Sequence, residues 1–153
     1  MQKSPCYIIL MTLLIVGNPA FGSDIDKRIK GLKSDDVMVR LSSVNALKEI
    51  GPKNPKVVPA LRAIVRDESE LVRMALVSSL EEFGDFARPL LEDLLLDKSK
   101  VIRLIAIRAL KVLKSEKSIP VLIGVLGHKD KAIRGYAAQT LGKIGSKKAV
   151  PAL

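Results

Sequence analysis

The chain has 153 residues and a net charge of +10, and it is 48% apolar but only 3% aromatic. This length suits one modest domain, and an apolar set made mostly of Leu, Ile, Val and Ala favours packed helices over a sheet. The only cysteine, Cys6, excludes an intramolecular disulfide, and together with a single histidine it excludes a closed zinc site.

Residues 1–22 have the pattern of a secretory signal peptide. The uncharged run YIILMTLLIV occupies 7–16, and the small residues Ala20 and Gly22 stand at the −3 and −1 positions of a cleavage site before Ser23. The run is shorter than the roughly 20 apolar residues of a membrane span. We therefore expect an exported bacterial protein, periplasmic or secreted, with no transmembrane segment after cleavage. An uncleaved anchor is the alternative.

The charge is distributed unevenly along the rest of the chain. Residues 24–65 have a net charge of +4, residues 66–97 have −6, and residues 98–148 have +11. The basic C-terminal part leaves open a second function, the binding of an anionic membrane surface or another polyanion. We do not expect nucleic acid as the partner, because no aromatic residues stand among these charges to stack on bases.

One sequence pattern occurs four times. Each copy begins with Val-Arg or Ile-Arg, and the arginines lie 33, 30 and 31 residues apart. The repetition indicates a stack of similar supersecondary units. The copies are VRLSSVNALKEIG (39–51), VRMALVSSLEEFG (72–84), IRLIAIRALKVLK (102–114) and IRGYAAQTLGKIG (133–145).

The four copies predict one helix each. Apolar residues at −1, +3, +7 and +10 relative to the arginine form one stripe of a helix. Four residues before each arginine stands a residue suited to the N-cap: Asp36, Ser69, Ser99 and Asp130. A glycine ends three copies in the position that favours a left-handed backbone, and Lys114 replaces it in the third.

A second helix follows each of these. Proline stands at 59, 89, 120 and 151, each time with leucine two residues later, and proline suits a first helical turn. The first three prolines each precede the next arginine by 14 residues, so the length variation falls between the two helices of a unit. A stack of units tolerates insertions at that place.

This pattern resembles the HEAT-repeat family, in particular its short bacterial HEAT-like form, over about residues 32–153. The resemblance implies an all-α fold, a right-handed α-α solenoid of about four helix pairs. We expect a capping half-unit at 24–33 and repeats over 34–153, divided at about 34–66, 67–97, 98–127 and 128–153. The last unit is incomplete, which suggests a fragment of a longer protein, or an end completed by a partner or a second copy.

The resemblance also implies that the recurring arginine and the acidic residue before it form a structural ladder between units. Asp36 and Arg40, like Asp130 and Arg134, are four residues apart and are predicted to pair on the helix surface. Arg73 and Arg103 have serine at the corresponding position, so Asp67 and Asp97 are the acids available to them.

No pattern indicates an enzyme. His128 is the only histidine and is expected to be a solvated loop residue, and Glu81-Glu82 are expected on the solvated side of a helix. There is no nucleophile elbow and no phosphate-binding loop. We predict no catalytic residue, no metal site and no cofactor. Similar HEAT-like repeats occur in lyases that attach bilin pigments to phycobilisome proteins, and this subgroup stays a remote alternative.

The predicted function is therefore that of an exported scaffold that binds another protein along an extended solenoid surface. In relatives the second helices line the concave side, and here they carry few charges. The candidate residues for binding an unknown protein partner are Arg62, Arg66, Glu92, Leu96 and Ile123, with Lys111 and Lys143 for the basic surface.

Overall fold

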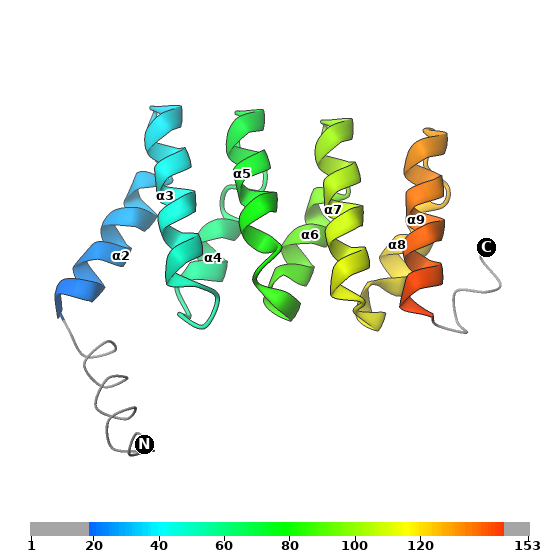
Figure 1. The fold of residues 1–153 in the computed structure, drawn as a ribbon. Helices are drawn as coiled ribbons and strands as arrows, with labels where there is room; N and C mark the ends of the chain where they lie inside the picture. The colour runs from blue at the N-terminus through cyan, green and yellow to red at the C-terminus, as the bar shows by residue number, and fades with distance from the viewer. Residues whose placement is uncertain (1–18, 146–153) are drawn as a thin grey trace, which may run out of the picture.

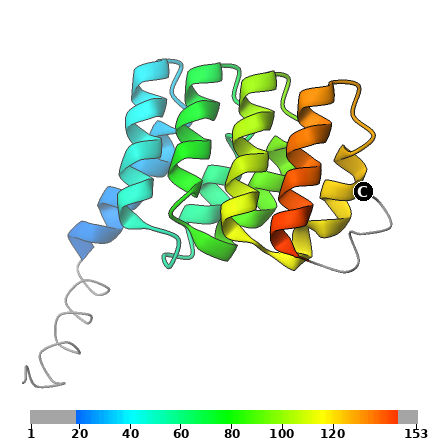
Figure 2. The same ribbon diagram turned by 45° about the vertical axis from the view of Figure 1, so that its right-hand side comes forward.

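The computed structural model describes residues 19–145, and the side chains from residue 24 onward. This part of the chain is all-α, as predicted, and its helices form two rows (Figures 1 and 2). One row holds α3 (Val37–Ile50), α5 (Glu70–Leu80), α7 (Lys100–Leu113) and α9 (Lys131–Ile144). The other holds α2 (Pro19–Gly31), α4 (Val57–Arg62), α6 (Arg88–Leu94) and α8 (Ile119–Val125), with short 3-10 turns η1 (Gly84–Ala87) and η2 (Glu116–Ser118).

The hydrophobic core lies between the two rows. The leucine seven residues after each arginine is almost fully buried in all four copies, at 47, 80, 110 and 141. The leucine two residues after each of the recurring prolines at 59, 89 and 120 is equally buried, at 61, 91 and 122. In the second row, α2 packs on α3, α6 on α7 and α8 on α9, and successive helices of the α3–α9 row pack on one another. The result is a HEAT-like solenoid.

The helix α2 closes the N-terminal end of the stack with polar residues. It packs against α3 in the way that α6 packs against α7. At the two positions where α4 places the buried side chains of Val57 and Leu61, α2 has Asp24 and Arg28, which form an ion pair of 3.2 Å. A polar outer face of this kind is typical of the terminal unit of a solenoid. The predicted cleavage point before Ser23 falls inside this helix.

The helix ends follow the predicted residue types with two differences. Lys114 adopts a left-handed backbone with a φ of 52°, at the position where Gly51 and Gly145 also have positive φ. In contrast, α5 ends at Leu80 although the sequence pattern continues to Gly84, so Glu81 and Glu82 lie in the following turn. The predicted helical position of this acidic pair is therefore wrong.

At the C-terminal end of the described part, no helix follows α9. Val125 and Leu126, at the end of α8, are half-buried, whereas the corresponding residues of α4 and α6 are buried. The predicted leader before residue 19 and the fourth second helix, with its proline at 151, lie outside the described residues. None of the described helices is long and apolar enough to cross a membrane.

Candidate functional site

Each recurring arginine closes the turn that leads into its own helix. One terminal nitrogen, Nη1, donates to two backbone carbonyls, those of the residues six and five positions earlier. In the first unit these bonds reach Ser34 and Asp35 at 2.7 and 3.1 Å, and in the last unit they reach His128 and Lys129 at 2.8 and 3.0 Å. This half of the contact is the same in all four units.

The other half of the guanidinium reaches the next unit. Arg40 contacts the carboxylate of Asp67, with Nε at 2.9 Å and Nη2 at 3.1 Å, and Arg73 contacts Asp97 at 2.7 and 3.2 Å. The four side chains are almost fully buried. In the Arg73–Asp97 pair both nitrogens donate hydrogen bonds, and bidentate geometry of this kind makes a strong charge-assisted contact. The hydrogen bond from Arg40 to Asp67 is the main cause of a pKa for Arg40 above its usual value.

Asp67 and Asp97 connect three units in series. The carboxylate of each accepts from the arginine of the preceding unit, and its backbone carbonyl accepts from the arginine of its own unit. Each carboxylate also accepts the amide of the residue two positions later, Ser69 at 2.9 Å and Ser99 at 2.7 Å. One aspartate therefore fixes a turn and joins two units.

The predicted pairs within a helix do not form among the described residues. Asp36 accepts the amide of Met38 at 2.8 Å as a helix cap. Asp130 caps α9 through the amide of Ala132 at 2.8 Å and forms an ion pair of 2.6 Å with Lys100 of the preceding unit. The hydrogen bond with Lys100 and that with the Ala132 amide lower the pKa of Asp130 to about 2.

The series ends at His128. This residue stands six positions before Arg134, where the preceding two units have Asp67 and Asp97. Its Nδ1 accepts the amide of Asp130 at 3.0 Å, so the ring replaces the carboxylate in the turn. It brings no negative charge for Arg103, whose buried Nε has no hydrogen-bond partner within the described part. His128 is thus half-buried at a joint between units, not the solvated loop residue that was predicted.

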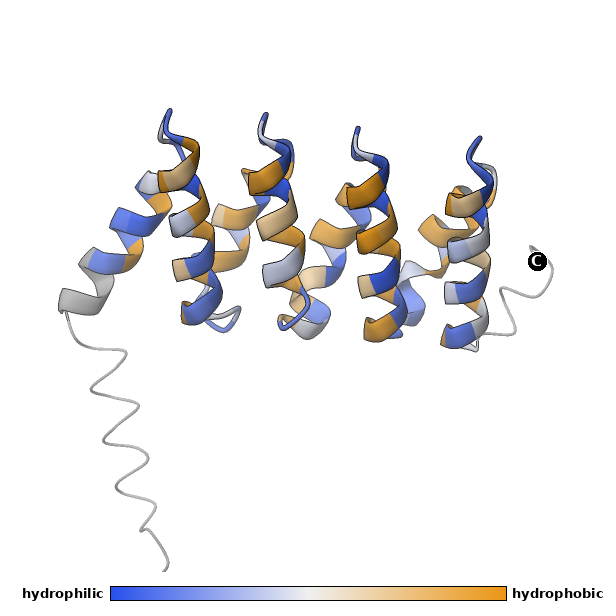
Figure 3. Ribbon diagram, turned by 45° about the horizontal axis from the view of Figure 1, so that its top comes forward, coloured by the Kyte–Doolittle hydropathy of each residue, from blue (hydrophilic) through white to orange (hydrophobic). Residues whose placement is uncertain are grey.

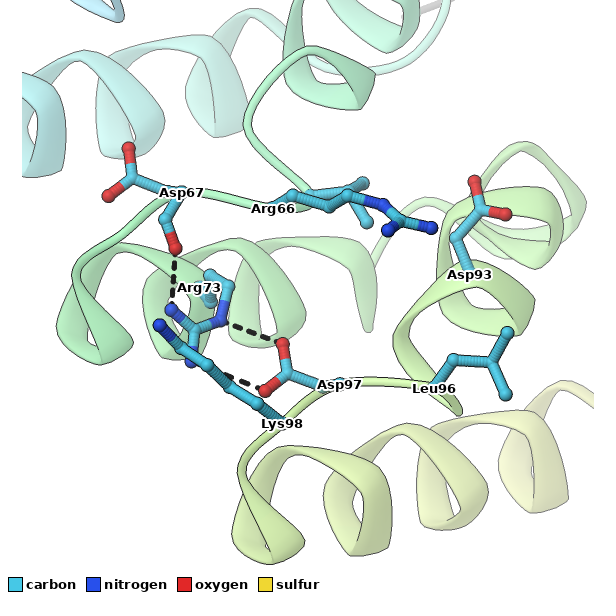
Figure 4. Close-up of a pocket in the computed structure, with 8 residues that line it drawn as sticks. Arg66, Asp67, Arg73, Asp93, Leu96, Asp97 and Lys98 are labelled. Carbon is cyan, nitrogen blue, oxygen red and sulfur yellow. Dashed lines mark hydrogen bonds and ion pairs between the residues drawn. The ribbon is translucent and has the colours of Figure 1, made fainter.

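A hollow of about 230 Å³ lies at the joint between the second and third units (Figure 4). Its floor is the buried Arg73–Asp97 pair, and its rim brings together two of the predicted partner-binding residues, Arg66 and Leu96. Lys98 and Asp93 complete the rim. The side chain of Leu96 is 80% exposed, the largest value among the exposed apolar residues of the described part.

The other predicted binding residues have contacts within the chain. Arg62 forms an exposed ion pair of 3.1 Å with Asp93, across α4 and α6. Glu92 accepts from Arg88 and from the hydroxyl of Ser118, which is buried, so it holds α6 to the start of α8. The remaining three lie apart from the hollow: Ile123 packs against the core, Lys111 donates to Gln139 at 2.8 Å, and Lys143 is exposed on α9.

The described residues hold no group of three His, Cys, Asp or Glu side chains that could bind a metal ion. The acidic pair in the turn after α5 makes separate contacts, Glu82 with Lys48 at 2.7 Å and Glu81 with Arg108 at 3.8 Å. The hydrogen bond with Glu82 is the main cause of a raised pKa for Lys48. These contacts stabilise neighbouring units and do not converge on a reaction site.

Sequence reasoning missed one surface. The residue two positions before each arginine is large, apolar and exposed in three units: Met38, Leu71 and Val101. The aligned copies contain the signal, because this column is large and apolar in three of them although it lies outside the buried stripe.

Comparisons with known proteins agree with this architecture. A family model described as HEAT repeats matches residues 25–111 and 88–153. The crystal structure of an engineered protein from the Northeast Structural Genomics Consortium matches with a TM-score of 0.57 and 21% sequence identity. The match covers 84% of this chain and 66% of the engineered chain, slightly less than two thirds of its length. No curated protein matches significantly.

Proposed function

Because the chain belongs to the HEAT-repeat family, we propose that it is an exported, non-enzymatic scaffold that binds a protein partner on the face formed by α4, α6 and α8. HEAT repeats are generally protein-interaction modules, and the stack offers a continuous surface without needing a deep cavity. The single observation that carries the proposal is the exposed side chain of Leu96 on the rim of the 230 Å³ hollow.

The rim of the hollow indicates the chemistry of the partner. Leu96 offers an apolar contact, and Arg66 and Lys98 add cationic side chains to the same rim. The carboxylate of Asp93 is already paired with Arg62. A partner segment with an apolar side chain next to an acidic one fits this rim, because a large apolar residue surrounded by polar groups is typical of interface centres.

The experiment replaces Leu96 with a photo-crosslinking amino acid in the natural host. We expect one specific crosslinked partner, lost when Arg66→Glu is added. Phe86, which is 55% exposed in η1 but away from the hollow, is the matched control position and should give no such product. Equal crosslinking from both positions, or none from Leu96, would contradict the proposed binding face. Fractionation of the same cells tests export, which predicts the protein outside the cytoplasm.

A further inference from the structure

An apolar row crosses the outer face of the stack, the side of α3, α5 and α7 that points away from α4, α6 and α8. Met38, Leu71 and Val101 are 68%, 61% and 50% exposed, and Met74, three positions after Leu71, is 37% exposed. Leu41 and Leu104, at the same place in α3 and α7, are partly buried against the core. Figure 3 shows hydrophobic residues at corresponding ends of these three helices. A contiguous exposed row of this kind marks an interaction surface.

The charges on this row of helices separate into two halves. The segments of α3 and α5 with their leading turns, 34–50 and 67–83, hold eight acidic and three basic residues. The corresponding segments of α7 and α9, 98–114 and 129–145, hold one acidic and ten basic residues. The face is therefore negative on one side of the line between α5 and α7 and positive on the other.

We propose that this outer face binds a second copy of the chain about a two-fold axis parallel to the helices, between α5 and α7. Such an axis places α5 of one copy against α7 of the other without inverting the helices. The apolar residues of α5 then meet those of α7, and the negative half of each copy meets the positive half of its partner. In a two-fold interface every contact occurs twice, so one self-complementary face satisfies both copies.

Individual positions agree with this pairing. Glu49 of α3 occupies the same outer position on its helix as Lys143 of α9, nine residues after the arginine. Opposite charges are therefore brought together at the pair of α3 with α9. Glu82 has this place in the second unit, in the turn after α5, where it also contacts Lys48 of its own chain. This arrangement gives an interface its specificity, because like-charged alternatives are repelled.

The outer helix pair is also complementary in size. α3 presents its large apolar residue Met38, whereas α9 has Ala132 at the same place in the repeat and Gly135 three residues later. A Cβ added at Gly135 would have no atom within 4 Å, so packing within the chain does not require glycine there. A glycine in an exposed helix interior costs about 1 kcal/mol relative to alanine. Under the two-fold axis, the large residues of α3 face these small ones.

The early end of α5 adds apolar surface next to the axis. A groove of about 580 Å³ opens between the turn after Leu80 and α7, with Leu91 in its floor and Val112, 76% exposed, on its rim. Exposed apolar surface therefore also lies between the two helices that the axis relates. The dimer leaves α4, α6 and α8 uncovered, so it goes beyond the proposed partner site and does not compete with it.

The test measures the mass of the full-length chain by sedimentation velocity over a range of concentrations. We expect a dimer in the wild type, and a dissociation constant at least about tenfold weaker in Leu71→Asp, since a charge is then buried against an apolar row. Leu96→Asp, on the other face of the stack, is the matched control and should dimerise like the wild type. Circular dichroism confirms that each variant is folded.

Two charge-reversed variants test the orientation. One carries Glu49→Lys and Glu82→Lys, so that both halves are positive at these positions, and the other carries Arg108→Glu and Lys143→Glu, so that both halves are negative at these positions. We expect each variant alone to be monomeric and an equimolar mixture to form heterodimers. Non-specific association through the N-terminal apolar run would give no such pattern.

The proposal is wrong if the wild type stays monomeric at every concentration, or if the two reversed variants dimerise alone as well as mixed. A monomeric wild type that co-sediments with vesicles of anionic phospholipid would replace the second copy with a lipid surface as the occupant of this face.

Discussion

The third joint between units has histidine at the position where the first two joints have aspartate. Asp67 and Asp97 supply a carboxylate to the arginine of the preceding unit, and His128 at the third joint does not. His128→Asp keeps an acceptor for the turn amide of Asp130, because Asp67 and Asp97 accept the corresponding amides. It also places a negative charge beside Arg103. We therefore expect this exchange to stabilise the protein.

The expected gain follows from the buried Nε of Arg103, which has no partner within the described part. A buried donor without a partner costs about 1–3 kcal/mol, and bonds between charged groups lie at the upper end of that range. The new carboxylate must lose part of its hydration, which offsets some of this gain. We expect a net increase of about 1–2 kcal/mol in the free energy of unfolding, or about 3–6 °C in Tm for a chain of this size.

The assay is thermal unfolding followed by circular dichroism, supported by a double-mutant cycle. His128→Asn is the matched control, because an amide oxygen can accept the turn amide but has no charge, and it should give a smaller gain. The stabilisation by His128→Asp should vanish when Arg103 is replaced by Met, since the cycle isolates the pair. Equal Tm values for the Asp and Asn variants, or a gain that survives without Arg103, would refute the reasoning.

Three further predictions concern single residues. Arg73→Ala should destabilise the protein by about 3–5 kcal/mol in denaturant unfolding, because it leaves Asp97 buried and unpaired. Arg134→Ala, at an exposed position, should shift the denaturation midpoint far less. Equal shifts in the two variants would contradict the structural role of the arginine–aspartate contacts. Lys114→Gly should raise the free energy of unfolding, measured by urea denaturation, by about 1 kcal/mol, because a non-glycine residue is strained at a φ of 52°. An unchanged or lower free energy of unfolding would argue against that strain. The pKa of the Asp130 carboxylate, followed by NMR, should be about 2 and should move toward the ordinary value of 3.8 in Lys100→Ala. Because the folded-state pKa is the lower one, its contribution to stability is present above about 3.8 and lost as the pH falls through about 2. A pKa unchanged by Lys100→Ala would exclude the pair.

The repeated elements could be predicted because each is specified several times. Leu47 and its three counterparts are buried at the same place in every unit, and four consistent copies outweigh one weak position. The early end of α5 could not be predicted in this way, because its sequence keeps the helical pattern as far as Phe83. Phe83 is buried at 3% exposure although the helix has already ended, so burial there does not require a continuous helix.

The partners of the arginines could not be predicted from spacing along the chain. A separation of four residues makes Asp36 a neighbour of Arg40 on the helix, but the carboxylate is used as a cap. The true partner, Asp67, lies 27 residues away, and only the packing of successive units brings it close. The role of His128 was missed for the same reason, since its place in the series has meaning only once Asp67 and Asp97 are seen to join units.

The central claim is that the contacts of Arg40 with Asp67 and of Arg73 with Asp97 hold the stack together. Native-state hydrogen exchange of the helices α3, α5, α7 and α9 tests this claim most directly. Both ends of a stack open more easily than its middle, so the claim concerns the difference between the ends. The account predicts that the amides of α9, beyond the joint without a carboxylate, exchange faster than those of α3, and that His128→Asp slows the exchange of α9. Equal protection at the two ends, or an α9 that does not respond to His128→Asp, would contradict it.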